Sequence, residues 1–316
     1  MLGDHKLLSL VEKRRLQLVP ADASELEMAE AQYRLGFALS CTAGNSSVRE
    51  GAALLREVVE VRRRALGDRH QDTLQSLWAL AVCVYYDAWS SRDENQKQQL
   101  RLASLNLMEE ALVGQREALG VEHEATLSSM VWTANILEHA GVERCAERED
   151  LYEKAIEAYT QLKGRMHWLT LSTINRLADT RFQSGAHSQA EALYRECIEG
   201  RRRVLGETNP STLASMRNLA DVLVTTGRPA DAALLYEQAY EGHQKVLGDD
   251  HVQTRRSLDK LTSFRTSGGA LVDQAGQAVV GTASSASEIA KTVGIGKAPK
   301  TKSEGNAKKS STCVVL

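Results

Sequence analysis

Apolar residues recur with helical spacing through most of this 316-residue chain. In the clearest stretch they predict one helix over about 210–226 and a second over about 230–247, with Gly227, Arg228 and Pro229 in the turn. Pro210 suits the first helical turn, where a missing N–H costs nothing. Because each helix has one apolar face, the pattern predicts antiparallel helix pairs that cover this face by stacking on neighbours.

A short motif marks the junctions between successive pairs and recurs five times. Its glycines stand at positions 67, 120, 164, 206 and 248, spaced by 53, 44, 42 and 42 residues, and a threonine follows each glycine six positions later. Glycine takes the left-handed conformation that ends a helix, and basic residues before it suit the negative helix end. A period of this length is typical of stacked repeats.

The pattern divides the chain into three parts. We expect residues 1–66 to form N-terminal helices and an irregular capping pair, and residues 67–265 to hold the repeats. Residues 266–316 are rich in Gly, Ala, Ser and Lys, and we expect disorder there because this composition cannot bury a core.

Within residues 67–265 the pairs are expected at about 70–119, 123–163, 167–205 and 209–247, with a closing helix at 251–265. We attribute the spacing of 53 to a polar insertion over residues 90–99, between the two helices of its pair. The spacing of 44 is attributed to two extra residues after Gly141.

Small and large residues alternate within the units in a pattern that resembles the tetratricopeptide consensus. The residues that carry it include Asn218, Leu219, Ala220, Gly227, Ala232, Tyr236 and Ala239, and again Ala178, Gly185, Ala190 and Tyr194. The 42-residue period, with Leu-Gly-x-x-His-x-x-Thr between units, resembles the kinesin-light-chain variety of the repeat. The resemblance covers about 66–265. It implies an all-α, right-handed solenoid of antiparallel helix pairs that acts as a protein-binding scaffold and not as an enzyme.

Two departures from kinesin light chains limit what the resemblance implies. The long heptad coiled coil that precedes their repeats has no counterpart here, so a motor subunit is not expected. Trp78 and Trp132 stand in the first two pairs where the family's Asn-Asn-Leu-Ala element is expected.

The first helix of each pair lines the concave surface of tetratricopeptide stacks. By this resemblance the groove would include five polar residues: Asn135, Asn175, Arg176, Arg217 and Asn218. Asparagine can donate to and accept from a peptide backbone, and arginine can pair with an acidic side chain. We expect a peptide groove that is polar at one end and lined by tryptophan at the other. The alternative is ordinary helix packing with a solvated face.

Four histidines occupy the third position after a repeat glycine: His70, His123, His167 and His251. Equivalent positions in stacked helices lie about 8–10 Å apart, whereas zinc ligands lie about 2 Å from one ion. We therefore expect capping contacts and no metal site. Gly294-Ile295-Gly296-Lys297 lacks the spacing of a phosphate loop. No catalytic motif is present, so neither a cofactor nor an enzyme activity is expected.

Net charge and cysteine content narrow the class of partner and the cellular compartment. A net charge of −2 gives no case for a nucleic-acid partner. The five cysteines form no Cys-x-x-Cys pair, which favours a reducing compartment. We expect four of them to act as small buried hydrophobic residues: Cys41, Cys83, Cys145 and Cys197.

The last four residues, Cys313, Val314, Val315 and Leu316, have the form of a prenylation box, and Leu at the final position points to geranylgeranyl. A lysine cluster precedes them: Lys297, Lys300, Lys302, Lys308 and Lys309. One lipid chain binds a membrane marginally, and each basic residue near an anionic leaflet adds about 1 kcal/mol. We expect an adaptor for protein or peptide partners, tethered at the cytoplasmic face of a membrane. The alternative is a soluble cytoplasmic scaffold, linked to motor cargo or chaperones, without a lipid anchor.

Overall fold

The structure, a computed structural model, describes residues 2–20, 22–41, 45–140 and 144–266. Over these ranges it contains twelve α-helices and no strand, which confirms the expected all-α class. The helices are α1 (Leu2–Gln17), α2 (Glu25–Ser40), α3 (Asn45–Leu66), α4 (Gln71–Ser90), α5 (Glu94–Leu119), α6 (Glu124–His139), α7 (Cys145–Lys163), α8 (Trp168–Gln183), α9 (His187–Leu205), α10 (Pro210–Thr225), α11 (Pro229–Leu247) and α12 (Val252–Phe264). The expected prenylation box and lysine cluster lie outside the described residues.

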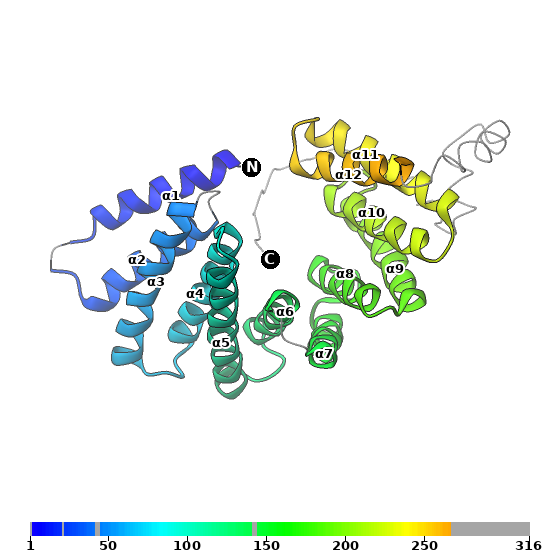
Figure 1. Cartoon of the computed structure of the whole chain (residues 1–316). Coiled ribbons are helices and arrows are strands. Elements are labelled where there is room, and N and C mark those ends of the chain that lie inside the picture. The colour runs from blue at the N-terminus through cyan, green and yellow to red at the C-terminus, as the bar shows by residue number, and fades with distance from the viewer. Residues whose placement is uncertain (1, 21, 42–44, 141–143, 267–316) are drawn as a thin grey trace, which may run out of the picture. The chain divides into compact units, whose positions relative to one another are not determined.

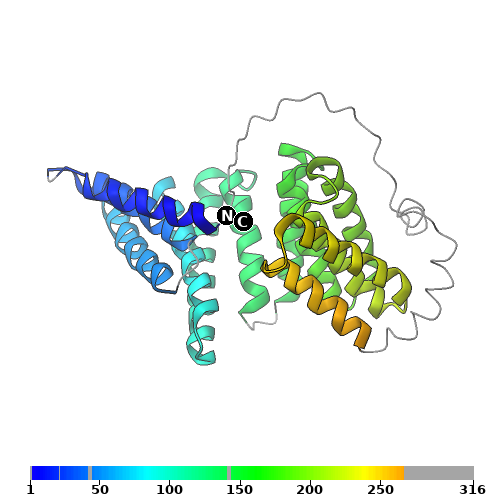
Figure 2. The ribbon, with the colours of Figure 1, turned by 90° about the horizontal axis from the view of Figure 1, so that it is seen from above.

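The described helices divide into two compact units at a point within α7, the first extending to Leu151 and the second beginning at Tyr152. In the first unit α1 to α5 each pack on the next helix of the chain (Figure 1). In the second unit α8 to α12 follow the same scheme (Figure 2).

Contacts between alternate helices complete each unit. Helix α4 also touches α2 and α6, and α10 touches α8 and α12. Within each unit the first helices of the pairs therefore form one layer, called here the first-helix layer of that unit.

The five repeat glycines end the second helices as predicted. Their φ angles lie between 83° and 95°, in the left-handed region that favours glycine. The next helix then begins with a side-chain cap. At His70, His123, His167 and His251 the imidazole Nδ1 accepts a hydrogen bond from the backbone N–H two residues later, at 3.2–3.3 Å. These bonds confirm the capping role expected for the histidines.

The polar insertion over residues 90–99 was expected between the two helices of its pair, but most of it belongs to the helices themselves, so this placement is wrong. Only residues 91–93 separate α4 from α5, and Asp93 caps α5 by accepting from the Asn95 N–H at 2.9 Å. Helices α4 and α5 have 20 and 26 residues, against 16 and 19 in α10 and α11. These extra four and seven residues account for the eleven by which the first spacing exceeds 42. The insertion contains no Gly or Pro to stop a helix, and residues 92–96 and 99 are exposed, whereas Ser91 is buried. The extra residues predicted after Gly141 lie outside the described ranges.

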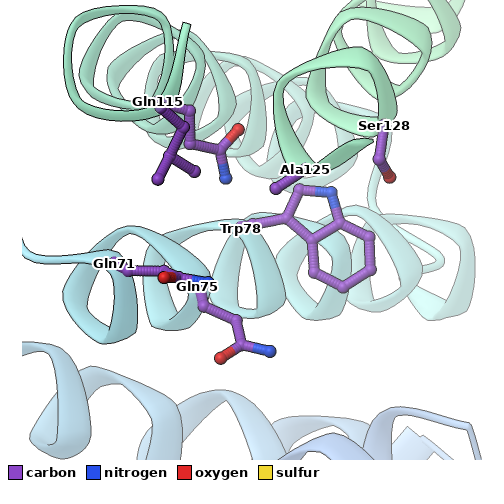
Figure 3. A pocket seen from close by; sticks show the side chains of 7 residues that line it. Gln71, Gln75, Trp78, Gln115, Ala125 and Ser128 are labelled. Carbon is purple, nitrogen blue, oxygen red and sulfur yellow. The ribbon is translucent and has the colours of Figure 1, made fainter. Parts of the chain in front are cut away.

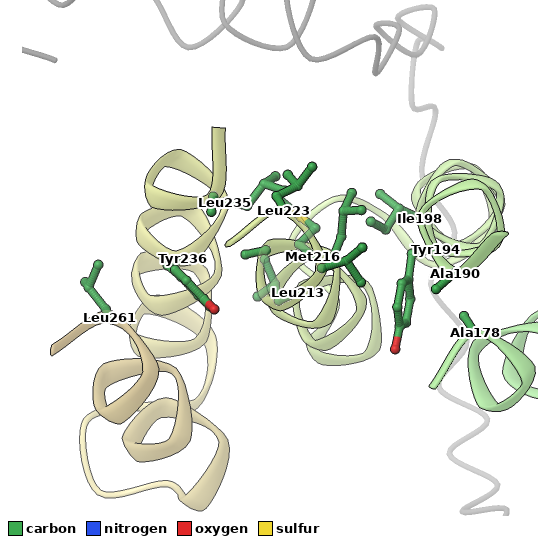
Figure 4. Close-up of a cluster of buried hydrophobic side chains, with 14 residues drawn as sticks. Ala178, Ala190, Tyr194, Ile198, Leu213, Met216, Leu223, Leu235, Tyr236 and Leu261 are labelled. Carbon is green, nitrogen blue, oxygen red and sulfur yellow. The ribbon is translucent and has the colours of Figure 1, made fainter. Parts of the chain in front are cut away.

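The two helices of a pair approach closely at a glycine six positions before the repeat glycine. A Cβ atom on Gly114, Gly200 or Gly242 would lie 2.3–2.6 Å from a leucine of the preceding helix. In the second unit this crossing borders a buried cluster that includes Tyr194, Met216, Leu223, Tyr236 and Leu261 (Figure 4). A matching cluster in the first unit includes Leu55, Leu77, Leu80 and Cys83.

The cysteine prediction is only partly right. Cys83 and Cys197 are fully buried, and burial raises the pKa of the Cys83 thiol to about 12. Cys41 is half-buried, whereas Cys145 is exposed because it is the first residue of α7. All four are free thiols. None of the described helices combines the length and apolarity needed to cross a bilayer.

Candidate peptide-binding faces

The five residues predicted to line a groove all lie on first helices, but in different units. Asn135 lies on α6 of the first unit and is only 8% exposed. Asn175 and Arg176 lie on α8 of the second unit, and Arg217 and Asn218 lie on α10. Arg176 is exposed and the other three of this unit are half-buried.

In the second unit both asparagines are engaged by a carboxylate that the sequence analysis missed. Asp179 accepts hydrogen bonds from Asn175 Nδ2 at 3.2 Å, from Asn218 Nδ2 at 3.0 Å and from the Tyr194 hydroxyl. The Asn175 Oδ1 accepts from Ser215 Oγ at 2.7 Å. These asparagines therefore join α8 to α10 and satisfy Asp179.

The same arrangement repeats one pair later. Asp221 accepts from the Tyr236 hydroxyl and forms an ion pair with Lys260 at 3.0 Å. Burial raises the pKa of Tyr194 and Tyr236, and the adjacent carboxylates raise it further. Each tyrosine follows its aspartate by fifteen positions, so a search for Asp and Tyr at this distance could have found both pairs.

The arginines of this face are less well compensated than its carboxylates. Arg217 donates to Gln253 Oε1 at 3.4 Å, and among the described residues neither Arg217, Arg176 nor Arg256 forms an ion pair. Desolvation lowers the pKa of Arg217, and the positive charge of Arg256 lowers it further, against the opposing effect of Asp221. The half-buried Arg217 guanidinium thus forms no ion pair with a carboxylate among the described residues.

The first unit presents aromatic rings at the corresponding positions. Trp78 and Trp132 meet edge to face with centroids 6.2 Å apart, and Phe37 lies 6.2 Å from Trp78 on the other side. Tyr85 and Tyr86 lie 5.9 and 6.1 Å from Trp132. The two tryptophans singled out in the sequence are therefore neighbours in one aromatic row.

A pocket of about 200 Å³ lies beside Trp78 (Figure 3). Its lining contains no charged side chain and consists of Gln71, Gln75, Trp78, Gln115, Leu119, Ala125 and Ser128. The Trp78 Nε1 is buried and has no hydrogen-bond partner among the described residues. Gln115 is 3% exposed, and its Oε1 accepts from Ser129 Oγ at 2.6 Å.

Gln115 belongs to a polar register that the sequence analysis also missed. A polar residue five positions before the repeat glycine bonds to a serine nine positions after it. The bonded pairs are Arg62 with Ser76 at 2.7 Å, Gln115 with Ser129 at 2.6 Å, Arg201 with Ser215 at 2.7 Å and His243 with Ser257 at 2.9 Å. The serines that recur nine positions after the repeat glycines could have revealed this register from the sequence.

Comparison with known proteins identifies the repeats. Two segments match models of the tetratricopeptide repeat, residues 169–245 and residues 48–72. No protein of curated function matches the chain.

Solved structures share the fold. One is a crystal structure described as Podosopora anserina putative kinesin light chain nearly identical TPR-like repeats. Its sequence identity to this chain is 22% and its TM-score is 0.57, and the match covers 71% of this chain and 99% of that chain. BtubC (BKLC) from P. vanneervenii is 14% identical, with a TM-score of 0.54, and covers 98% of this chain and 97% of its own. At these identities the likeness establishes a tetratricopeptide-like helical-repeat fold.

Proposed function

We propose that this chain is a protein-interaction scaffold whose first-helix layer binds an extended peptide of a partner, with Arg217 recognising an acidic side chain. One observation carries the proposal: the Arg217 guanidinium is half-buried and has no carboxylate within ion-pair distance among the described residues. A partner carboxylate could accept two parallel N–H bonds from it, which is the strongest arrangement for this pair.

The neighbouring groups favour an acidic ligand over a basic one. Arg176 and Arg256 are exposed on the flanking first helices α8 and α12, so they add positive charge beside Arg217. The carboxylates of this face are already satisfied, Asp179 by Asn218 and Tyr194, and Asp221 by Lys260 and Tyr236. Tetratricopeptide-like neighbours described as kinesin light chains support a scaffold role.

A titration with a hexaglutamate peptide and a hexaglutamine control tests the charge preference. We expect the wild type to bind hexaglutamate at least tenfold more tightly, and the double variant Arg176→Ala with Arg217→Ala to lose this preference. Arg203→Ala is the matched control, because Arg203 is exposed on the second helix α9 and pairs with Glu199. Equal loss in both variants, or unchanged binding in the double variant, would exclude the Arg217 face.

We further propose that a geranylgeranyl group on Cys313, helped by the lysines at 297, 300, 302, 308 and 309, attaches the scaffold to a membrane. The support is the sequence of residues 313–316 and the preceding lysines. The chemistry requires Leu316 to be the carboxyl-terminal residue in the cell, and mass spectrometry of the natural protein establishes that first.

Fractionation of a eukaryotic cell tests the membrane proposal. We expect the wild type in the membrane pellet and Cys313→Ser in the supernatant, because one missing lipid removes most of the apolar anchoring. Cys145→Ser is the control, since it removes an exposed thiol from the repeat region. Wild type in the supernatant would favour the lipid-free scaffold.

A further inference from the structure

The pocket beside Trp78 occupies a place that an arginine fills in the preceding repeat. There, Arg62 is 4% exposed, and its guanidinium lies over the Tyr33 ring at 4.9 Å from the centroid. It pairs with Glu30 at 2.5 Å and donates to the Asp72 carbonyl at 3.0 Å and to Ser76 Oγ at 2.7 Å. This set shows what the junction between two pairs offers to a guanidinium.

Counting from the repeat glycines places Gln115 at the position of Arg62, with Ala125 and Ser129 at the positions of Asp72 and Ser76. The first helices align with an offset of 45 residues, which pairs Trp78 with Tyr33 and Gln75 with Glu30. Two contacts support this alignment.

The backbone carbonyl of Gly36 lies against Gly51, and that of Ala81 accepts from Ser104 Oγ at 2.8 Å. Gly51 and Ser104 each precede their repeat glycine by sixteen positions, and the two carbonyls are 45 residues apart. The aromatic ring, the acceptor on the first helix and the carbonyl of the next helix thus all have counterparts around the pocket.

The junction that contains the Trp78 pocket lies between α5 and α6, and it lacks the guanidinium. Gln115 is shorter than arginine, so it reaches Ser129 but leaves a pocket of about 200 Å³ that Trp78, Gln75 and Ala125 line. Figure 3 shows the Gln115 side chain extending from α5 toward the α4 helix that carries Trp78. Its Nε2 makes no hydrogen bond among the described residues, although the side chain is 97% buried.

A carboxylate is not needed for a guanidinium in such a junction. Arg201, at the same register in the second unit, is 8% exposed and donates to the Ser211 carbonyl at 2.8 Å and to Ser215 Oγ at 2.7 Å. Among the described residues it forms no ion pair. The uncharged lining of the Trp78 pocket is therefore compatible with an arginine.

We propose that the Trp78 pocket binds the guanidinium group of an arginine presented by a protein partner. The guanidinium stacks on the Trp78 indole, a favourable surface for a cation, and donates to the Ala125 carbonyl and to Gln75 Oε1. Arginine is favoured over lysine because its planar fork can stack and donate to several acceptors at once. The inference rests on the proposed scaffold function, because it names a residue of the partner.

The small probe for the test is N-acetyl-arginine-methylamide, compared with the equivalent citrulline and leucine compounds. Binding is followed by NMR of the full chain. We expect saturable shifts at Trp78 with the arginine probe and at least fivefold weaker binding of the other two. Equal or tighter binding of the leucine probe would show an apolar side-chain site, and equal binding of citrulline would remove the role of charge; either result overturns the proposal.

Two substitutions of opposite charge at the exposed Gln75 test the site without disturbing the buried core. Gln75→Glu supplies the counterpart of Glu30 and is expected to tighten arginine binding several-fold. Gln75→Lys places a cation at the pocket and is expected to weaken it at least tenfold. If both variants bind the arginine probe as the wild type does, the pocket is not the site.

The variant Gln115→Arg supplies the guanidinium within the chain. We expect a folded protein, with thermal stability equal to or above that of the wild type, in which the arginine probe no longer binds. Binding of hexaglutamate through Arg217 should be unchanged, so failure here is distinguishable from failure of the proposed acidic-peptide face. A stable Gln115→Arg protein that still binds the arginine probe would contradict the proposal.

Discussion

Single polar residues at the junctions decide how successive pairs join. Arg62, Gln115, Arg201 and His243 occupy one register and are all at least 92% buried. Each forms a hydrogen bond with a serine of the next first helix, so at least one polar atom of each buried side chain is paired. The type of side chain at this register differs between junctions. At Gln115, which is shorter than the arginines, a pocket remains beside the side chain.

His243 makes the last junction sensitive to pH. Its Nε2 lies 3.2 Å from the Pro210 carbonyl, which can only accept, so the neutral ring donates there and accepts from Ser257 Oγ through Nδ1. Burial lowers the pKa of His243 below 6.5, and the charges of Arg217 and His251 lower it further. The unfolded chain therefore takes up the proton first as pH falls.

We predict that His243 contributes stability that is fully present above about pH 6.5 and is lost as pH falls below it toward the folded-state pKa. Each unit of difference between folded and unfolded pKa corresponds to about 1.4 kcal/mol. Urea unfolding of the wild type and of His243→Gln at pH 7.5 and pH 5.5 measures the effect. Glutamine keeps a donor and an acceptor, so the variant should lose less stability on acidification. An equal loss in both proteins would remove His243 as the cause.

At the scale of the element, helix ends were more predictable than helix lengths. The expected helices over 210–226 and 230–247 agree closely with α10 (Pro210–Thr225) and α11 (Pro229–Leu247). Their ends depend on local chemistry, a capping Asn209 and glycines with positive φ, which the sequence states directly. The extension of α4 and α5 was missed because its polar composition resembles a loop, although no helix-breaking residue is present.

The candidate sites were only partly predictable for a related reason. The resemblance to tetratricopeptide units assigned Trp78, Trp132, Arg217 and Asn218 to first helices, and the structure places them there. Contacts between helices do not follow from it. The binding of Asn218 to Asp179 and the pocket beside Gln115 depend on which side chains meet across a junction.

The close crossing of helices α10 and α11 gives an element-scale prediction. A Cβ at Gly242 would lie 2.6 Å from Leu213 Cδ1, so Gly242→Ala should destabilise the second unit by about 1–3 kcal/mol through overpacking. Leu213→Ala alone should also destabilise it, by leaving a cavity. In the double variant the new methyl enters that cavity, so the loss should be less than the sum. Additive losses in chemical denaturation would show that the two residues are not in contact.

At the scale of the whole molecule, the two units share one repeat but present different chemistry. The first-helix layer of the first unit carries an aromatic row and an uncharged pocket. That of the second unit carries arginines whose charge is uncompensated within the described residues, beside carboxylates that are already bonded. Each unit therefore carries its own proposed site: Arg217 for an acidic side chain in the second unit, and the Trp78 pocket for an arginine in the first.

Selection from a random peptide library on the immobilised full-length chain tests the central claim, peptide recognition by the first-helix layer, most directly. We predict enrichment of peptides with acidic residues, whose binding weakens at high salt and falls at least tenfold on Arg217→Ala. Enriched peptides without an acidic preference, or acidic peptides that bind Arg217→Ala as tightly as the wild type, would contradict it.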